Sequence, residues 1–269
     1  MNKNSMYKFD KKNIQGGAGR LIVGEDTMKR PDKISDVMDL DTYELTDGYK
    51  DLGATTEGIQ QSRGFETEDV EIDQSTTPID TSITNWTNAI STTLMETHTE
   101  NRQLAMCGGA IKETAATLGT ATKLAGPIAK DARILKVTSA TEFKEGGFAK
   151  VGEETIQISS ISGNVITLKK GVTEAAEAET DVTPVKELGT KTISYGAPSS
   201  IPAKQLVLIS QREDGTFLMI VYYEVKLNGD SVESTFDKNK RSMPIGFVAF
   251  AQDDLPEDEN VFKEIEQVI

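Results

Sequence analysis

The chain has 269 residues, of which 37% are hydrophobic and 27% are charged, enough apolar material for one large or two modest folded domains. Its 29 Lys and Arg against 43 Asp and Glu give a formal net charge of −14, which argues against DNA backbone binding as the main source of affinity. A single cysteine, Cys107, and a single histidine, His98, exclude an intrachain disulfide and a metal site built from cysteines or a histidine pair. We find no signal-peptide pattern and no run near 18 apolar residues, so we expect a soluble protein made in a reducing compartment.

The N-terminal part combines a polar arm with a strongly acidic stretch. Residues 1–12 form the arm, which we expect to order only by docking on a partner, and a glycine cluster at 16–19 precedes a predicted strand at 20–23. Thirteen acidic side chains lie between residues 36 and 80 against only Lys50 and Arg63. This stretch therefore carries most of the net negative charge.

Two strands and a short helix are predicted next. Alternating apolar and polar residues predict a strand at 70–73, and β-favouring side chains predict another at 81–94. The sequence Thr97-His98-Thr99-Glu100 matches a capping box, which predicts a helix from about Thr99 to Cys107 that ends at Gly108-Gly109 in a left-handed conformation.

The middle of the chain predicts a separate β module. Residues 110–131 are rich in Ala, Thr and Gly, and their pattern does not decide between a weak helix and an extended connection. Strands at 134–137, 155–158 and 165–168, with a hairpin turn at 162–164, predict an inserted β module over residues 134–185.

The last part of the chain contains the strongest hairpin pattern. Asp214-Gly215 lies between apolar runs at 205–210 and 216–225, and a further strand is predicted at 245–250. Beyond an acidic stretch that begins at Asp253, the spaced apolar residues of 261–268 predict a short strand or helix that docks at a subunit contact. The sequence thus predicts a mainly β fold with one short α-helix.

No pattern of catalytic or ligand-binding residues is complete. The glycine cluster lacks the Lys-Ser/Thr of a phosphate-binding loop, and Ile22 stands where a dinucleotide fingerprint needs its third glycine. There is no Gly-x-Ser-x-Gly elbow, and Asp39-Leu40-Asp41 continues with Tyr43 and Glu44 where a calcium loop needs an oxygen ligand and a glycine. We interpret His98 as a surface or interface residue, Cys107 as a small buried hydrophobe, and Trp86 as a core or interface anchor. We therefore predict no catalytic residue, cofactor or metal, and a non-enzymatic protein.

The order of several motifs resembles phage major tail proteins, the subunits of the tail tube. The motifs are Gly-Ala-Thr-x-Glu-Gly at 53–58, a strand that ends in Asp-Gln-Ser at 73–75, a Pro-x-Asp turn at 78–80, and Ser-Thr-Thr-Leu at 91–94 before a short helix. Residues 202–210, the Asp214-Gly215 hairpin and residues 243–250 also resemble this family. Together the similar segments cover about two-thirds of the chain.

The resemblance implies a tail-tube-type β-sandwich or half-barrel flanked by a helix, formed by residues 1–133 and 186–269 with N- and C-terminal arms. It further implies six copies in a ring and rings stacked into a hollow tube that conducts DNA into the host. The implied partners are other copies of the chain, a tape measure protein, a tail terminator, and distal tail or baseplate proteins. The resemblance also implies that DNA passes through the tube transiently, and it does not decide whether a sheath protein is a further partner. No membrane anchor is expected. The implied location is the virion tail, after assembly in the host cytoplasm.

Candidate site residues follow from this expectation. Acidic residues that would face the lumen and repel passing DNA are Glu66, Glu68, Glu71 and Asp73, although the same acids could instead solvate the outer surface or pair across subunits. The candidate inter-ring loop consists of Asp39, Asp41, Tyr43, Tyr49 and Asp51. Candidate packing or interface residues are Trp86, Leu104 and Phe262.

We expect the β module at 134–185 to face outward, because a module of this size would block a channel. Two alternatives to the tube subunit remain. One is a ring-forming tail terminator, distal tail or head–tail joining protein. The other is a host-surface binding module that uses the β module as its contact.

Overall fold

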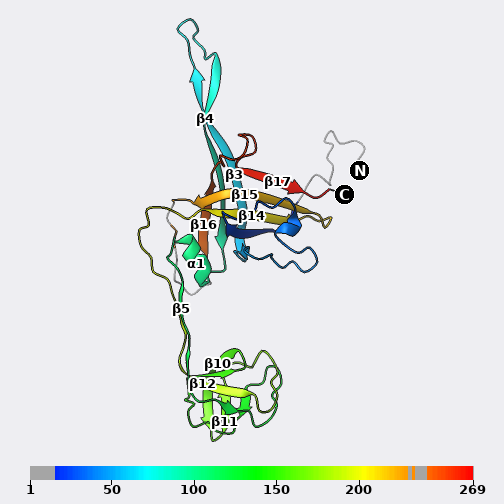
Figure 1. Cartoon of the computed structure of the whole chain (residues 1–269), viewed down its shortest axis with the longest axis vertical. Helices are drawn as coiled ribbons and strands as arrows, with labels where there is room; N and C mark the ends of the chain where they lie inside the picture. Colours follow the sequence, from blue (N-terminus) through cyan, green and yellow to red (C-terminus); the bar gives the residue numbers. More distant parts are fainter. Residues whose placement is uncertain (1–15, 230–231, 234–240, 269) are drawn as a thin grey trace, which may run out of the picture. The chain divides into compact units, whose positions relative to one another are not determined.

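The computed structural model describes residues 16–229, 232–233 and 241–268, and Figure 1 shows its course. The chain forms two compact units. Unit 1 comprises Met1–Ala110 and Ser194–Ile269, and unit 2 comprises Ile111–Ile193. The fold is mainly β with several antiparallel sheets and one α-helix among the described residues, as the sequence predicted. The predicted N-terminal arm, residues 1–12, lies outside the described residues.

Unit 1 is built on an eight-stranded sheet. Its path is β2-β1-β14-β15-β16-β4-β3, and β17 pairs with β15 off this path. The strands are β1 (Gly19–Glu25), β2 (Lys50–Asp51), β3 (Thr55–Val70), β4 (Asp80–Leu94), β14 (Lys204–Gln211), β15 (Phe217–Leu227), β16 (Met243–Ala249) and β17 (Phe262–Glu266). A short 3₁₀ helix, Ile34–Asp36, lies in the connection between β1 and β2.

The middle parts of the central strands β14 and β15, residues 206–209 and 217–223, are continuously apolar because this part of the sheet is covered on both faces. Leu206 and Tyr222 belong to one apolar cluster, whereas Val207 and Val221 belong to a second cluster. Since successive side chains of a strand point to opposite faces, a strand between two clusters reads as a continuous apolar run. The Asp214-Gly215 hairpin between β14 and β15 is confirmed, with Gly215 at a φ of 86°.

The sheet divides at β15, because β16 and β17 share one edge of this strand. β17 pairs with residues 218–222 of β15, and β16 pairs with residues 225–227 farther along the same strand. The branch that contains β16 leads through β4 to β3, which has no further partner among the described residues. The tail segment predicted as a strand or helix is therefore a strand, and β3 is a free edge.

Helix α1 (Thr99–Ala105) follows β4, close to the predicted range, but both of its ends differ from the prediction. The N-cap residue is His98 and makes no side-chain capping hydrogen bond, so the predicted capping box at Thr97 is wrong. At the other end Cys107 adopts the left-handed conformation, with a φ of 49°. The amide of Gly108 donates to the carbonyl of Gln103 and that of Cys107 to the carbonyl of Leu104, which is a Schellman motif.

The predicted strand at 70–73 is also corrected. β3 ends at Val70, and the following residues form the turn of a hairpin with β4. The alternation of Val70 and Ile72 reflects an exposed turn, because both side chains lie at the surface.

Unit 2 is a small β domain with its own core. A seven-stranded sheet has the path β6-β12-β9-β10-β11-β8, with β7 beside β12, and a separate pair joins β5 to β13. The strands are β5 (Lys112–Thr114), β6 (Thr117–Leu118), β7 (Thr122–Lys123), β8 (Ile134–Lys136), β9 (Phe148–Val151), β10 (Glu154–Ser162), β11 (Val165–Leu168), β12 (Asp181–Glu187) and β13 (Thr190–Thr192). Side chains such as Leu124, Leu135, Ile158 and Val182 are buried in one cluster that contains no residue of unit 1.

The β module is wider than predicted. It begins at Ile111 and ends at Ile193, whereas the sequence indicated 134–185. The difference arises because the Ala- and Thr-rich residues 110–131 contain the short strands β6 and β7, which pair with β12. Strands of two residues carry too little periodicity to be recognised in a sequence.

The two units differ sharply in charge. Unit 2 contains eleven basic and eleven acidic side chains and is therefore neutral, so unit 1 carries the whole formal charge of −14. The described residues include no helix with the length and apolar content needed to cross a bilayer.

Candidate functional site

The β3–β4 hairpin extends well beyond the rest of its sheet (Figure 1). β4 pairs with β16 only from Ala89 to Leu94, so residues 64–87 have no strand partner apart from each other. We call residues 64–87 the outer hairpin. A two-stranded ribbon of this kind is marginally stable alone, and its exposed side chains are free to contact another molecule.

One face of the outer hairpin is aromatic and apolar. Phe65 is paired with Trp86 in the register, and Thr67 is paired with Ile83, so these side chains lie on the same face. The rings of Phe65 and Trp86 are 5.1 Å apart, and 46% of the Trp86 side chain is exposed. We call Phe65, Ile83 and Trp86 the aromatic face. Trp86 is thus a surface residue of the single chain and is not part of its core.

The opposite face of the outer hairpin is acidic. Glu66 and Glu68 alternate with Phe65 and Thr67 along β3, so their side chains point away from the aromatic face. Glu71 and Asp73 lie in the turn, and all four predicted lumen acids are exposed. The structure places these four residues together on the hairpin.

The base of the hairpin is fixed by a cation between two rings. The guanidinium carbon of Arg63 lies 4.6 Å from the Trp86 ring centroid and 5.3 Å from that of Phe262 on β17. Phe262 in turn stacks on the buried ring of Tyr222 at 5.0 Å. Phe262, predicted as a packing or interface residue, therefore connects the base of the hairpin to the core.

The turn of the hairpin carries aliphatic side chains. Val70, Ile72 and Ile79 are exposed there, and we call these three residues the aliphatic tip. They stand among carboxylates that include Glu71, Asp73 and Asp80. Large aliphatic side chains that are exposed on a projecting turn are available for a contact with another molecule.

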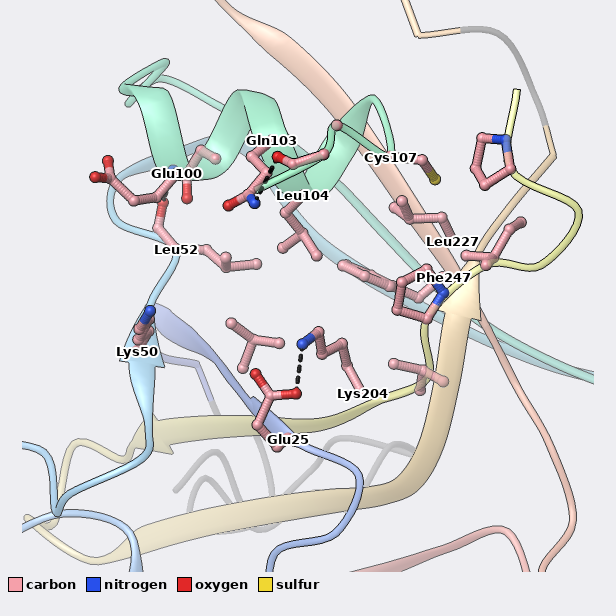
Figure 2. A pocket seen from close by; sticks show the side chains of 18 of the residues that line it. Glu25, Lys50, Leu52, Glu100, Gln103, Leu104, Cys107, Lys204, Leu227 and Phe247 are labelled. Carbon is pink, nitrogen blue, oxygen red and sulfur yellow. Dashed lines mark hydrogen bonds and ion pairs between the residues drawn. The ribbon is translucent and has the colours of Figure 1, made fainter. Parts of the chain in front are cut away.

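Unit 1 also contains a cavity of about 930 Å³ beneath α1 (Figure 2). Leu52, Leu104, Leu227 and Phe247 line its apolar part, and they come from segments far apart in the sequence. The loop from Ser194 to Pro202 forms part of the wall, and Cys107 lines the cavity beside it. Leu104, predicted as a packing or interface residue, thus contributes to the wall of an open cavity.

The rim of this cavity is polar and mostly neutralised. Lys204 donates to Glu25 at 2.6 Å, and His98 lies 3.8 Å from Glu100. Asp51 is bound by Arg20 at 2.6 Å. Lys50 also lines the cavity and takes part in no ion pair among the described residues.

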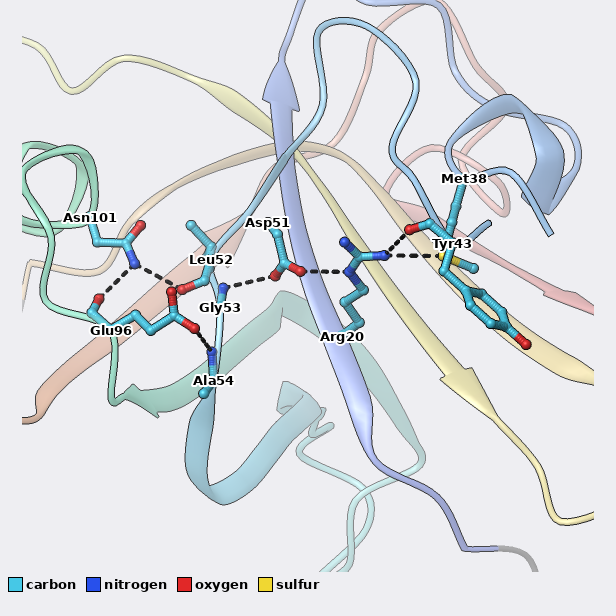
Figure 3. Close-up of polar contacts among 9 residues, drawn as sticks. All are labelled: Arg20, Met38, Tyr43, Asp51, Leu52, Gly53, Ala54, Glu96 and Asn101. Carbon is cyan, nitrogen blue, oxygen red and sulfur yellow. Dashed lines mark hydrogen bonds and ion pairs between the residues drawn. The ribbon is translucent and has the colours of Figure 1, made fainter. Parts of the chain in front are cut away.

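A polar network supports the wall of the cavity (Figure 3). The buried side chain of Asn101 on α1 donates to the carbonyls of Leu52 and Glu96, each at 2.8 Å. The Glu96 carboxylate accepts from the amide of Ala54, and Asp51 accepts from the amide of Gly53. The Asn101 bond joins α1 to the segment that contains Asp51 and Leu52, two residues that line the cavity.

The predicted inter-ring loop divides into exposed and structural residues. Asp39 and Asp41 are exposed, as is Tyr43, whose carbonyl accepts a hydrogen bond from Arg20. The Asp39 carboxylate accepts hydrogen bonds from the amides of Thr42 and Asp41, and these bonds hold the pKa of Asp39 below its usual value.

Tyr49 and Asp51 lie differently. Tyr49 is buried, and its hydroxyl donates to Gln205 at 2.8 Å. Asp51 is half-buried and engaged with Arg20. These two residues therefore stabilise unit 1 and are not part of an exposed loop.

His98 and Cys107 both lie at the ends of α1, next to the cavity. His98 is half-exposed, and Cys107 is partly exposed and not the buried hydrophobe that the sequence suggested. Within residues 16–229, 232–233 and 241–268, no three His, Cys, Asp or Glu side chains gather as metal ligands would.

No protein-family model matches the chain, and no curated protein matches it.

Proposed function

We propose that this protein is a structural subunit that polymerises with copies of itself into a hollow tube, the tube of a phage tail. Its stacked hexameric rings would surround a lumen that conducts DNA. The observation that carries this proposal is the outer hairpin, which exposes Phe65, Ile83 and Trp86 on a ribbon that pairs with no other strand among the described residues.

Self-association would cover two exposed features of this hairpin, its aromatic face and its free sheet edge. Burying apolar surface contributes about 25 cal/mol per Å², so covering the aromatic face favours association. The 16-residue strand β3 is also a free sheet edge, whose unpaired amides and carbonyls promote pairing with another chain. A contact that repeats from copy to copy would cover the aromatic face and pair the edge of β3, and no β3 edge would stay exposed once the ring closes.

The charge distribution supports a channel that does not retain DNA. Glu66 and Glu68 lie on the face opposite the aromatic face, so both can remain exposed when the aromatic face is covered. Sixfold repetition would turn each carboxylate into a ring of negative charge. Since the Debye length is about 8 Å at physiological salt, this repulsion acts only where the acids lie close to the DNA path. Tail localisation and the outward position of unit 2 are part of the same proposal.

Negative-stain electron microscopy of the purified full-length protein tests the proposal. We expect long hollow tubes with a central channel. Isolated rings would favour a tail terminator, distal tail or head–tail joining protein, and monomers that bind host cells would favour a surface-binding module. A protein that stays monomeric at every concentration and is absent from virus particles would contradict all assembly functions.

A pair of variants tests the role of the aromatic face. Phe65→Ser with Ile83→Ser should abolish tubes while circular dichroism stays unchanged, because both side chains are already exposed in the single chain. The matched control is Ile134→Ser, which removes an isoleucine with 57% exposure from unit 2 and leaves the hairpin unchanged. Tubes formed equally by both variants would show that the aromatic face is not an assembly contact.

A further inference from the structure

We infer that the N-terminal arm of one copy, residues 1–12, adds as a strand to the outer part of β3 in the next copy. The inference rests on the proposed function and names one contact by which the copies join. It follows from the free edge of β3, from the charge of the outer hairpin and from the residue pattern of the arm.

β3 offers an edge with which an extended segment can pair. No described strand pairs with β3 on the side away from β4. The outer part of β3, residues 64–70, is about as long as a typical strand. A segment added there gains main-chain hydrogen bonds without any change in the pairing of β3 with β4.

The outer hairpin also lacks cations. Residues 64–87 contain six carboxylates and no Lys or Arg, and none of the six forms an ion pair with another described residue. The six acidic residues are Glu66, Glu68, Asp69, Glu71, Asp73 and Asp80. A basic segment is therefore the electrostatic complement of this hairpin.

The N-terminal arm has the required charge. Its four lysines and one aspartate give a net charge of +3, against −6 for residues 64–87. The bound pair keeps a net charge of −3 per copy. The contact is therefore compatible with a lumen wall that repels DNA.

The pattern of the arm has the alternation of a strand. Tyr7 and Phe9 alternate with Lys8 and Asp10, and Lys12 continues the second series. Since successive side chains of a strand point to opposite faces, the two rings would lie on one side of an added strand and the two lysines on the other.

This alternation matches the two faces of the hairpin. Phe65 belongs to the aromatic face, whereas Glu66 and Glu68 point to the opposite face. In the orientation that extends the aromatic face with the two rings of the arm, the two lysines lie on the side of these glutamates. Lys11 then falls on the aromatic side, to which Asp69 also points. The reverse orientation would place the rings among carboxylates, so the pattern selects one orientation.

The proposed ring makes the arm of another copy the occupant. An arm on β3 of its own chain would close this edge to the next copy. Residues 13–18 connect the arm to β1, and six residues can span roughly 20 Å when extended. The arm can therefore reach an adjacent copy. Since each copy donates one arm and receives one, the contact is heterologous and propagates from copy to copy.

A charge exchange in the full-length protein tests this contact. We expect Lys8→Glu with Lys12→Glu to raise the concentration at which tubes first appear by about tenfold, because attraction to the hairpin becomes repulsion. Light scattering and negative-stain electron microscopy measure this concentration. Glu66→Lys with Glu68→Lys should have the same effect, and all four substitutions together should restore assembly.

The matched control is Lys169→Glu with Lys170→Glu. It makes the same change in charge at two exposed residues of unit 2 and should leave the concentration for tube formation unchanged. A fourfold variant that assembles no better than Lys8→Glu with Lys12→Glu would contradict the contact.

Cross-linking between two variants identifies the copy that supplies the arm. Both carry Cys107→Ala, so that each contains one thiol, and one carries Phe9→Cys in the arm while the other carries Thr67→Cys in β3. After the two are mixed and assembled, a short bismaleimide should join them into heterodimers on a denaturing gel. Ser160→Cys, at an exposed serine of unit 2, replaces Thr67→Cys as the control and should give no heterodimer with Phe9→Cys.

The possible results separate this inference from the proposed function. Mixed tubes without heterodimers would overturn the inference and leave the proposed function standing. A chain with both Phe9→Cys and Thr67→Cys that yields only internally cross-linked monomer would assign the arm to its own chain and would also overturn it. Absence of tubes from the wild-type protein would count against the proposed function itself.

Discussion

The guanidinium carbon of Arg63 lies 4.6 Å from the centroid of the Trp86 ring. Arg63 belongs to β3 and Trp86 to β4, the two paired strands of the hairpin. The same cation contacts Phe262 on β17 at 5.3 Å, so it joins the projecting hairpin to the sheet. Each such contact contributes about 0.5–1 kcal/mol at an exposed site.

Replacing this cation should loosen the hairpin. We expect Arg63→Ala to increase hydrogen exchange of the amides in residues 64–87, while the amides of β14 and β15 stay protected. Arg63→Lys keeps the charge but lacks the planar group that stacks on both rings, and it should give an intermediate rate. Equal exchange in the wild-type and Arg63→Ala proteins would show that the cation does not hold the hairpin.

Trp86 is the only tryptophan in the chain, and its fluorescence reports on the aromatic face. In the single chain 46% of its side chain is exposed, so its emission should lie toward longer wavelengths. Assembly that covers the aromatic face should shift this emission to shorter wavelengths and reduce quenching by acrylamide. The measurement is a spectrum recorded across the concentration at which tubes first appear, and an unchanged spectrum would place Trp86 outside the contacts.

We expect the buried phenol of Tyr222 to make the folded protein less stable at alkaline pH. Burial raises its pKa to about 12, and a hydrogen bond with Gln61 opposes this shift. The pKa of a phenol in the unfolded chain is about 10, so the unfolded state releases its proton first. The stability contributed by neutral Tyr222 is therefore fully present below about pH 10 and is lost as the pH rises toward 12. Tyr222→Phe should lose less stability over this interval, as measured by urea unfolding at pH 8, 10 and 11.

Unit 2 should be dispensable for the fold of unit 1. The amide of Gly109 donates to the carbonyl of Ser194 at 2.9 Å, so the two chain segments of unit 1 meet where unit 2 is inserted. A variant in which a short Gly-Ser linker replaces residues 111–193 should fold, keep the formal charge of −14 and form tubes. Complete loss of tubes in a folded variant would show that unit 2 takes part in assembly.

Cys107 occupies a position that favours glycine. Its φ of 49° at the C-terminal end of α1 lies in the left-handed region, where a side chain costs roughly 1–2 kcal/mol that glycine avoids. We expect Cys107→Gly to raise the free energy of unfolding by up to about 1 kcal/mol, because the greater entropy of glycine in the unfolded chain offsets part of the gain. A urea titration compares it with Cys107→Ala, which keeps the β-carbon and should give no gain.

Much of the fold was predictable because local patterns determined it. The Asp214-Gly215 turn and the apolar runs beside it predicted β14 and β15, and the turn at Gly163 predicted the β10–β11 hairpin. Helix α1 was found as well, but its N-cap was misplaced because His98 has no capping pattern of its own. The boundaries of unit 2 were missed because β6 and β7 each contain only two residues.

The candidate sites were less predictable, because they depend on pairings between distant residues. The sequence predicted Trp86 as a core or interface anchor. The aromatic face became visible only in the strand register, which pairs Trp86 with Phe65. Tyr49 and Asp51 were assigned to an exposed loop, and nothing local indicated their partners Gln205 and Arg20. The cavity beneath α1 escaped prediction because its wall combines segments of β1, α1, β16 and the loop 194–202.

The hydrogen bond between Gly109 and Ser194 makes the insertion point a natural site for protein fusions. A foreign domain whose termini lie close together can replace residues 111–193 there without separating the strands of unit 1. In a polymer of this subunit, such a cargo would be displayed once per copy at regular spacing.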